Sequence, residues 1–302
     1  MKSSGLFSSK QLQMLAAGDE KVLNDFDAQG LFPGIGESAE EFAARMGKLS
    51  AALEKLHNDL KKTPDLEVAS GIRINEKNAI SGNVTNEALD QTGALYNVRP
   101  EWVPGFFANE SFGIFWGGCS LSDPDSGLSL FIIRKAFKKK PRWLFYRRQE
   151  LLAHEMTHAS HQAFTEWMFE EYFAYQTASS ALRKFFGGCF IHKFDSLGFI
   201  GPILLLPVMQ FLNLFQIVNC PMGFFWCLAG VYPAFLALRT CWINRIAGRA
   251  RKFLIKKKAP HPGAALFRMS VAEIKTLAAG RMPQGNDLRW KILQKYLDNG
   301  QE

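Results

Sequence analysis

Two histidines and a glutamate form the pattern HExxH within the stretch ELLAHEMTHASH, residues 150–161. His154 and His158 are four residues apart, so on a helix both imidazole rings lie on one face and reach the same point. Glu155 follows His154 directly and projects about 100° away around the helix axis. The spacing therefore predicts two metal ligands, with a carboxylate beside the metal that can accept a proton from a bound water.

The same stretch carries an apolar stripe that a helix could bury. Leu152, Met156, Ala159 and Ala163 recur at helical spacing,. Such a helix packs one side into a core while its histidines face a cleft. An ordinary polar packing helix is the alternative interpretation, because HExxH also arises by chance.

The form HEMTH resembles the zincin metallopeptidases, and the resemblance covers about residues 127–186. It implies an α+β fold with a mostly helical core, in which a β-hairpin or sheet precedes the HExxH helix and a second helix supplies a glutamate. It also implies one Zn²⁺ ion, bound by His154 and His158. Glu155 would be the general base, and then a proton shuttle to the leaving amine, in the hydrolysis of peptide bonds by a zinc-bound water.

The third zinc ligand has to come from outside the motif. Metzincins continue as HExxHxxGxxH, but here His161 occupies the glycine position and Phe164 the last histidine position. Gluzincins instead take a glutamate from a following helix, often within an ExxA context, which Glu171 and Ala174 match. Glu171 is therefore the expected third ligand. Glu170, which points about 100° away on a helix, ranks second, and His161 ranks third.

This ligand set requires a break in the chain after the HExxH helix. One unbroken helix would place Glu171 about 19 Å along the axis from His158, whereas zinc–oxygen distances are about 2 Å. The chain must therefore reverse between His161 and Trp167. Thr165 is an acceptable N-cap for a second helix, although no glycine or proline marks the break.

A β-hairpin is expected just before the HExxH helix. Residues 111–118 and 127–135 are rich in aromatic and β-branched side chains, and the turn sequence DPDSG separates them,. In a zincin, a strand beside the active helix binds the substrate along its edge. Residues 127–135 could be that strand, or equally an interior strand. Tyr172 and Tyr175 could stabilise an oxyanion, or could be core side chains.

A long apolar segment predicts a membrane anchor. Ser196–Leu238 spans 43 residues without a formal charge, enough for two membrane helices of about 20 residues each. We expect them near 197–217 and 222–240, reversing around residues 219–223. Basic residues flank the pair on both sides, which favours cytosolic flanks. A buried helical hairpin in a soluble core and a re-entrant hairpin are the alternatives.

Charge is unevenly distributed along the chain. Residues 1–133 contain 11 Lys and Arg against 18 Asp and Glu, and residues 134–302 contain 25 against 10. Such asymmetry indicates that the second half meets an anionic surface. We favour lipid over nucleic acid, because the basic residues 134–148 precede the apolar segment.

Four regions are expected in total. These are a helical and irregular region at 1–110, a zincin-like catalytic core at 111–190, a two-helix membrane hairpin at 196–241 and a basic cytosolic tail at 242–302. Within the first, residues 10–62 are expected to be helical, with a capping box at Ser38 and Glu41. Residues 63–110 are expected to be irregular with short strands.

These features favour a membrane-anchored zinc metallopeptidase acting on peptides or proteins, with a lipid bilayer and no nucleic acid as its other partner. Because no secretory signal is visible at the amino-terminus,, both termini and the active site are expected on the cytosolic side of a plasma or inner membrane. The alternative is a non-catalytic membrane adaptor whose HExxH is incidental or degenerate.

Overall fold

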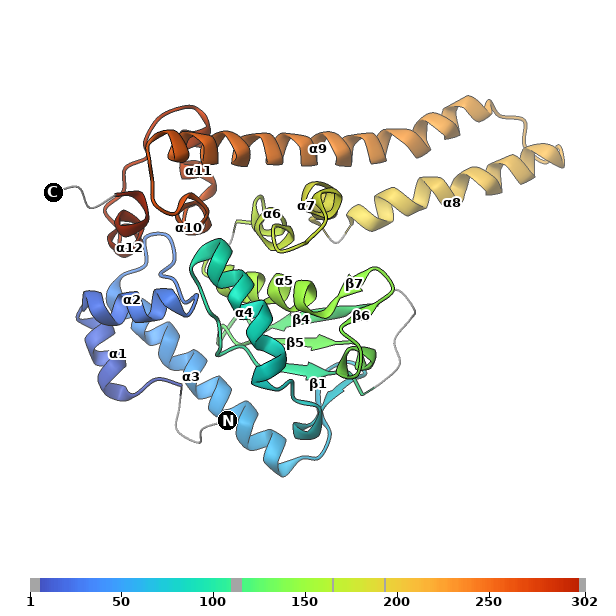
Figure 1. Cartoon of the computed structure of the whole chain (residues 1–302). Helices are drawn as coiled ribbons and strands as arrows, with labels where there is room; N and C mark the ends of the chain where they lie inside the picture. Colours follow the sequence, from blue (N-terminus) through green and yellow to red (C-terminus); the bar gives the residue numbers. More distant parts are fainter. Residues whose placement is uncertain (1–5, 110–115, 165, 193, 299–302) are drawn as a thin grey trace.

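A small sheet covered by the HExxH helix forms the centre of the globular part (Figure 1). The computed structural model describes residues 6–109, 116–164, 166–192 and 194–298. The sheet has the order β3-β5-β4, with β3 (Gly105–Phe107) parallel and β4 (Gly118–Ser122) antiparallel to β5 (Ser129–Ile133). Every residue of β5 is buried, and α5 (Arg148–His161) packs against the sheet. The chain is therefore a mixed α+β protein.

A β-hairpin around the expected turn is formed by β4 and β5, but its first strand lies at residues 118–122 and not at the expected 111–118. Its turn is closed by the Asp123 amide, which donates to the Leu128 carbonyl at 2.8 Å. Residues 111–115 of the expected first strand lie outside the described residues. Of the two interpretations of residues 127–135, the interior strand is correct, because β5 lies between β3 and β4. Within the described part of the sheet, β4 is the edge strand beside α5.

Three helices form the amino-terminal region, as expected: α1 (Ser9–Ala16), α2 (Glu20–Ala28) and α3 (Ala39–Lys62). The capping box is confirmed. The Glu41 amide donates to Ser38 Oγ at 3.2 Å, and the Ser38 amide donates to Glu41 Oε2 at 2.9 Å. The apolar face of α3 is buried in the main core.

The expectation of an irregular region at 63–110 is wrong for its middle part. Two short strands are present, β1 (Leu66–Ala69) and β2 (Ile72–Ile74), but α4 (Gly82–Tyr96) is a helix of 15 residues. Gly82 and Asn83, which suggest a turn, form its first turn. Packing outweighs their weak helix propensity, because α4 lies against α5 and buries Ala88, Leu89 and Tyr96.

The remaining elements are short, except for two long helices. They are η1 (Glu76–Asn78), η2 (Lys135–Lys138), β6 (Arg142–Trp143), β7 (Tyr146–Arg147), α6 (Glu170–Tyr175), α7 (Ala181–Phe186), η3 (Gly187–Cys189), α8 (Asp195–Leu214), α9 (Met222–Lys256), α10 (Pro262–Phe267), α11 (Val271–Ala278) and α12 (Leu288–Leu297). The strands β6 and β7 pair as a second, tight hairpin directly before α5.

Both long helices are long and apolar enough to cross a membrane. They form a hairpin that projects from the globular part (Figure 1), with mean hydropathies of 1.8 for α8 and 1.4 for α9 in their most apolar windows. Only 6% and 11% of these windows are buried, so the helices are not a core hairpin. The second helix is longer than the span expected at 222–240. It continues across the globular part to Lys256.

The described part of the expected basic tail, residues 242–298, is folded into the globular part. They continue α9 and then fold through α10, α11 and α12 into the same hydrophobic core as the amino-terminal helices. A buried ion pair joins the two ends of the chain, with Arg268 Nε donating to Asp27 Oδ1 at 2.5 Å. The Tyr296 hydroxyl donates to the same carboxylate at 2.6 Å.

Candidate metal centre

The chain reverses direction between the HExxH helix and the glutamate helix, as the ligand set requires. Helix α5 ends at His161, and α6 begins at Glu170 after Phe169 as N-cap. Thr165, the expected N-cap, lies outside the described residues. The glutamate helix is short, because α6 ends at Tyr175 and a separate helix, α7, follows.

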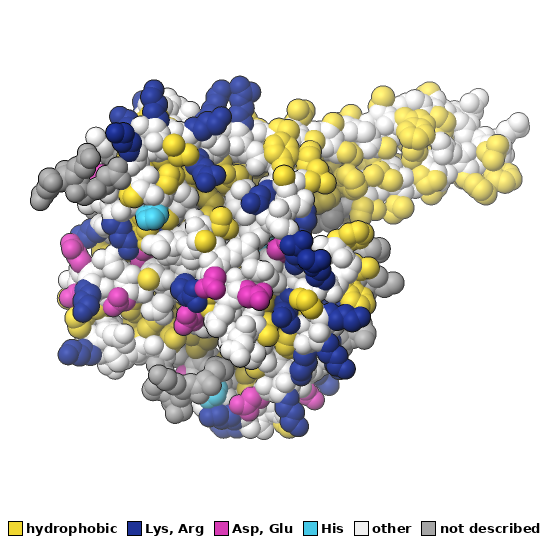
Figure 2. Space-filling model, viewed as in Figure 1, with side chains coloured by type: hydrophobic (Ala, Val, Ile, Leu, Met, Phe, Trp, Pro, Cys, Tyr) yellow, Lys and Arg dark blue, Asp and Glu magenta, His cyan; other side chains and the backbone are white. Residues whose placement is uncertain are grey.

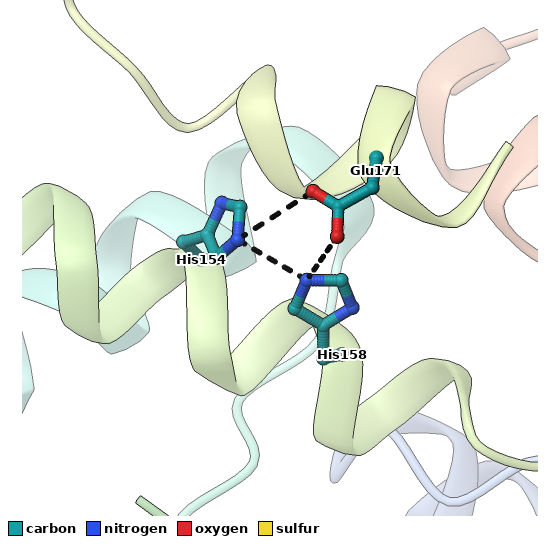
Figure 3. A group of neighbouring side chains, drawn as sticks. All are labelled: His154, His158 and Glu171. Carbon is teal, nitrogen blue, oxygen red and sulfur yellow. Dashed lines mark hydrogen bonds and ion pairs between the residues drawn. The ribbon is translucent and has the colours of Figure 1, made fainter. Parts of the chain in front are cut away.

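The three predicted ligands point toward one another from α5 and α6 (Figure 3). His154 Nε2 lies 3.1 Å from His158 Nε2 and 3.8 Å from Glu171 Oε2, and His158 Nε2 lies 3.5 Å from Glu171 Oε1. Tetrahedral ligands at zinc–ligand bonds of about 2.0 Å are about 3.3 Å apart. The donor atoms therefore have the chemistry and the spacing that one zinc ion needs.

Glu170, the second-ranked ligand, lies behind His158. Its Oε1 accepts a hydrogen bond from His158 Nδ1 at 2.9 Å, and this bond is the largest cause of the lowered pKa of the Glu170 carboxyl. With its proton on Nδ1, a neutral His158 ring would present the lone pair of Nε2 toward Glu171. Carboxylates commonly hold metal-binding histidines in this way, so the position of Glu170 suits the orientation of His158 better than direct ligation.

His154 is held as a neutral imidazole. Burial, followed by the charges of His158 and Arg183, lowers its pKa to about 3. The backbone of Ala174, the alanine of the ExxA pattern, hydrogen-bonds to the histidine. Its ring also packs edge-on against Tyr175, with ring centroids 4.7 Å apart. A neutral, fixed ring is the form that binds a metal.

The surroundings of His158 favour a positive charge. Burial lowers the pKa of His158, but the hydrogen bond to Glu170 and the charges of Glu171 and Glu155 raise it to about 9. Burial in turn raises the pKa of the Glu171 carboxyl. Three carboxylates thus converge on the imidazole pair, and a cation between the rings and Glu171 would balance their charge.

Glu155 lies beside the ligands in a cavity of about 270 Å³. The cavity is also lined by His154, Tyr175 and Gly118. Burial raises the pKa of the Glu155 carboxyl to about 7. A carboxyl with a pKa near neutrality can both accept and return a proton at physiological pH.

Two other candidate residues lie outside the cavity. The His161 ring is buried among aromatic side chains, stacked on Phe164 at 4.7 Å and tilted against Phe267 at 5.0 Å. Tyr172 packs against Phe173 at 5.4 Å. The positions of His161 and Tyr172 fit core side chains. Tyr175, in contrast, lines the cavity. Burial raises the pKa of its hydroxyl to about 12, so the hydroxyl keeps its proton at neutral pH.

The edge strand β4 runs beside α5, with contacts near both ends of the helix. At its start, a Cβ on Gly118 would lie 2.8 Å from the Ile132 carbonyl oxygen and 3.2 Å from a Leu151 methyl group, so glycine permits this close approach. At its end, Gln162 Nε2 donates to Ser122 Oγ at 2.7 Å. Sequence reasoning missed this role of β4, and the glycine pair at residues 117 and 118 was the signal that could have indicated it.

A partly buried ion pair at the cavity was also missed. Arg183 Nη1 of α7 donates to Glu150 Oε2 of α5 at 2.5 Å, and both side chains line the cavity. The first turn of α5 is thereby fixed to the segment that follows the glutamate helix. No protein-family model, curated protein or solved structure matches the chain.

Proposed function

We propose that this chain is a membrane-anchored zinc metallopeptidase whose ligands are His154, His158 and Glu171. The observation that carries the proposal is the spacing of 3.1 to 3.8 Å among the three sets of donor atoms, which come from two separate elements. The hydrogen bond from His158 to Glu170 adds weight, because it fixes the tautomer that a metal requires,. The zincin resemblance and the geometry agree on the same three residues.

When bound, zinc would polarise the scissile carbonyl and lower the pKa of the attacking water. Glu155 accepts the proton of that water and delivers it to the leaving amine, a double role that suits a carboxyl with a pKa of about 7,. The Tyr175 hydroxyl donates a hydrogen bond to the developing oxyanion. Peptide substrates bind in extended form along β4, whose outer edge has no strand partner among the described residues,.

The anchor of this enzyme is the hairpin of α8 and α9. Its helices carry no formal charge between Asp195 and Arg239, and most of their surface lies outside the protein core. The basic residues on both flanks favour a cytosolic position for the termini and for the site, in a plasma or inner membrane.

The replacement of Glu155 by glutamine tests the proposed chemistry. Glu155→Gln removes the proton acceptor but leaves all three ligands, so hydrolysis of a fluorogenic peptide library should fall by at least about 10²-fold while zinc content stays at the wild-type level. The measurement is made on full-length protein in detergent with added zinc. An active Glu155→Gln variant would contradict the assigned role, and an inactive zinc-loaded wild type would contradict the function.

A further inference from the structure

Two elements that line the cavity also expose apolar side chains. Tyr146 of β7 and Arg183 of α7 both line the cavity, with the guanidinium carbon 6.0 Å from the centre of the tyrosine ring. The β6–β7 turn exposes 53% of Leu144 and 80% of Phe145, and α7 exposes 68% of Leu182. We call the β6–β7 turn and α7 together the rim.

Exposed apolar side chains are concentrated in this part of the globular domain. Outside the whole hairpin, residues 195–256, ten large apolar side chains are exposed among the described residues, and eight of them lie between residues 144 and 194; the remaining two are Ile35 and Met282. An exposed apolar cluster of this kind marks an interaction surface. It continues directly into the apolar surface of the hairpin, since residues 187–194 connect α7 to α8.

The rim lies at the depth where a bilayer would begin. Asp195 and Arg239 are the last charged residues before the uncharged part of each helix, and they pair at 2.5 Å. Asn244 is five residues beyond Arg239, about 7.5 Å along the helix axis, and its side-chain amide donates to the Phe185 carbonyl of α7 at 3.0 Å. The headgroup layer on each side of a bilayer is about 5–8 Å thick, so α7 falls within it.

Charge on the same side of the domain suits an anionic lipid surface. Lys138, Lys139, Lys140 and Arg142 immediately precede the β6–β7 turn. Figure 2 shows Lys and Arg side chains gathered on the flank from which the hairpin extends, next to yellow apolar side chains, and Figure 1 places the β6–β7 turn on that flank. Basic residues around an apolar patch are typical of binding to anionic headgroups.

We propose that the rim rests on the bilayer, with the β6–β7 turn and α7 in the headgroup layer, so that the cavity opens at the membrane surface. The substrates would then be polypeptide segments held at that surface, such as the parts of membrane proteins next to their spanning helices. A soluble peptide would reach the cavity less often than a segment that diffuses in the plane of the bilayer. This substrate class rests on the proposed peptidase function, whereas the contact between the rim and the bilayer does not.

Lipid-dependent quenching tests the rim without any activity measurement. The five native cysteines are replaced by serine, and a single Phe145→Cys or Ile35→Cys is labelled with an environment-sensitive fluorophore. The protein is placed in nanodiscs of phosphatidylcholine and phosphatidylglycerol in equal parts, with doxyl-labelled lipid as quencher. We expect quenching and a blue shift at position 145, and neither at position 35, which lies beside the α12 end of the domain. Equal, unquenched signals would overturn the proposal.

A comparison of two substrates tests whether the enzyme prefers segments held at the membrane surface. It uses the protein with every native cysteine in place. One peptide that the wild type cleaves is offered either free in solution or attached to a lipid anchor in the same nanodisc. We expect kcat/KM to be higher for the anchored form by about tenfold or more, because anchoring raises its local concentration, and Phe145→Ser should reduce this ratio. Equal rates in the wild type would overturn the substrate class. Quenching at position 145 without cleavage of either peptide would refute the peptidase and support the bilayer contact.

Discussion

Glu170 and Glu171 are neighbours in the sequence with different positions at the site. Glu171 faces both imidazole Nε2 atoms, and Glu170 accepts a hydrogen bond from the opposite side of the His158 ring. The motif and the ExxA spacing were sufficient to predict that His154, His158 and Glu171 lie close together. The position of Glu170 was not predictable, because it depends on where α6 returns to α5, and no glycine or proline marks that reversal.

The position of Glu170 predicts a graded loss of zinc affinity. Glu170→Gln keeps a hydrogen-bond acceptor but removes its charge, so the dissociation constant for zinc should rise by about 10–100-fold. Glu171→Gln removes a ligand and should weaken binding further. Competition with a chromophoric chelator measures both, with the exposed Glu101→Gln as control. Equal affinities for the Glu170→Gln variant and the wild type would contradict the positioning role.

Tyr175 and Tyr172 provide a matched pair for the oxyanion prediction. Tyr175 lines the cavity beside His154, and Tyr172 packs against Phe173 outside it. Loss of one hydrogen-bond donor to an oxyanion typically lowers kcat by about 10²–10³-fold. We therefore expect that loss for Tyr175→Phe, and little change for Tyr172→Phe, in steady-state peptide hydrolysis with zinc content measured alongside. Equal kcat values for the two variants would assign Tyr175 a packing role only.

At the scale of elements, the alignment of α5 with β4 would decide where a substrate binds in the proposed peptidase. The helix and the hairpin were predictable from apolar periodicity and the DPDSG turn. The order of strands was not, because β3 comes from residues far before the hairpin and covers the edge of β5 that the sequence left open. Helix α4 was missed for a similar reason. It packs on α5, and the helix propensity of its first residues is weak.

The close approach of β4 to α5 predicts a steric effect at one glycine and not at its neighbour. A Cβ at Gly118 would meet the Ile132 oxygen at 2.8 Å, whereas one at Gly117 would make ordinary contacts of 3.5 Å with Tyr146. Gly118→Ala should destabilise the fold by about 1–3 kcal/mol and reduce hydrolysis, and Gly117→Ala should be tolerated. Thermal unfolding in detergent measures the difference. Similar melting temperatures for the two variants would show that β4 can shift without cost.

At the scale of the whole molecule, one core unites the two ends of the chain and leaves the hairpin outside it. Asp27 and Arg268 are 241 residues apart and form a buried ion pair. No local pattern in the sequence predicts such a contact. The uncharged part of the hairpin, in contrast, was predictable from its lack of charge, because little of it is buried in the core. The extension of α9 to Lys256 was not predictable, because that part of the helix packs in the core.

This arrangement predicts that the hairpin can be removed without loss of the site. Asp195 and Arg239 are paired at the base of the hairpin, so a short Gly-Ser linker can replace residues 196–238 between them. The shortened chain should become extractable from membranes by alkaline carbonate and should still bind zinc. The full-length chain should resist extraction. Extraction of the full-length chain would contradict the membrane anchor.

Zinc content of the purified full-length protein is the most direct test of the central claim. Mass spectrometry of metals should find one zinc ion per chain in the wild type and a loss of most of it in His154→Ala and Glu171→Ala. His161→Phe is the matched control, because this histidine lies on the same helix but is buried among aromatic rings; that variant should keep its zinc. A wild type without stoichiometric zinc after zinc supplementation, or a Glu171→Ala variant that retains it, would contradict the account.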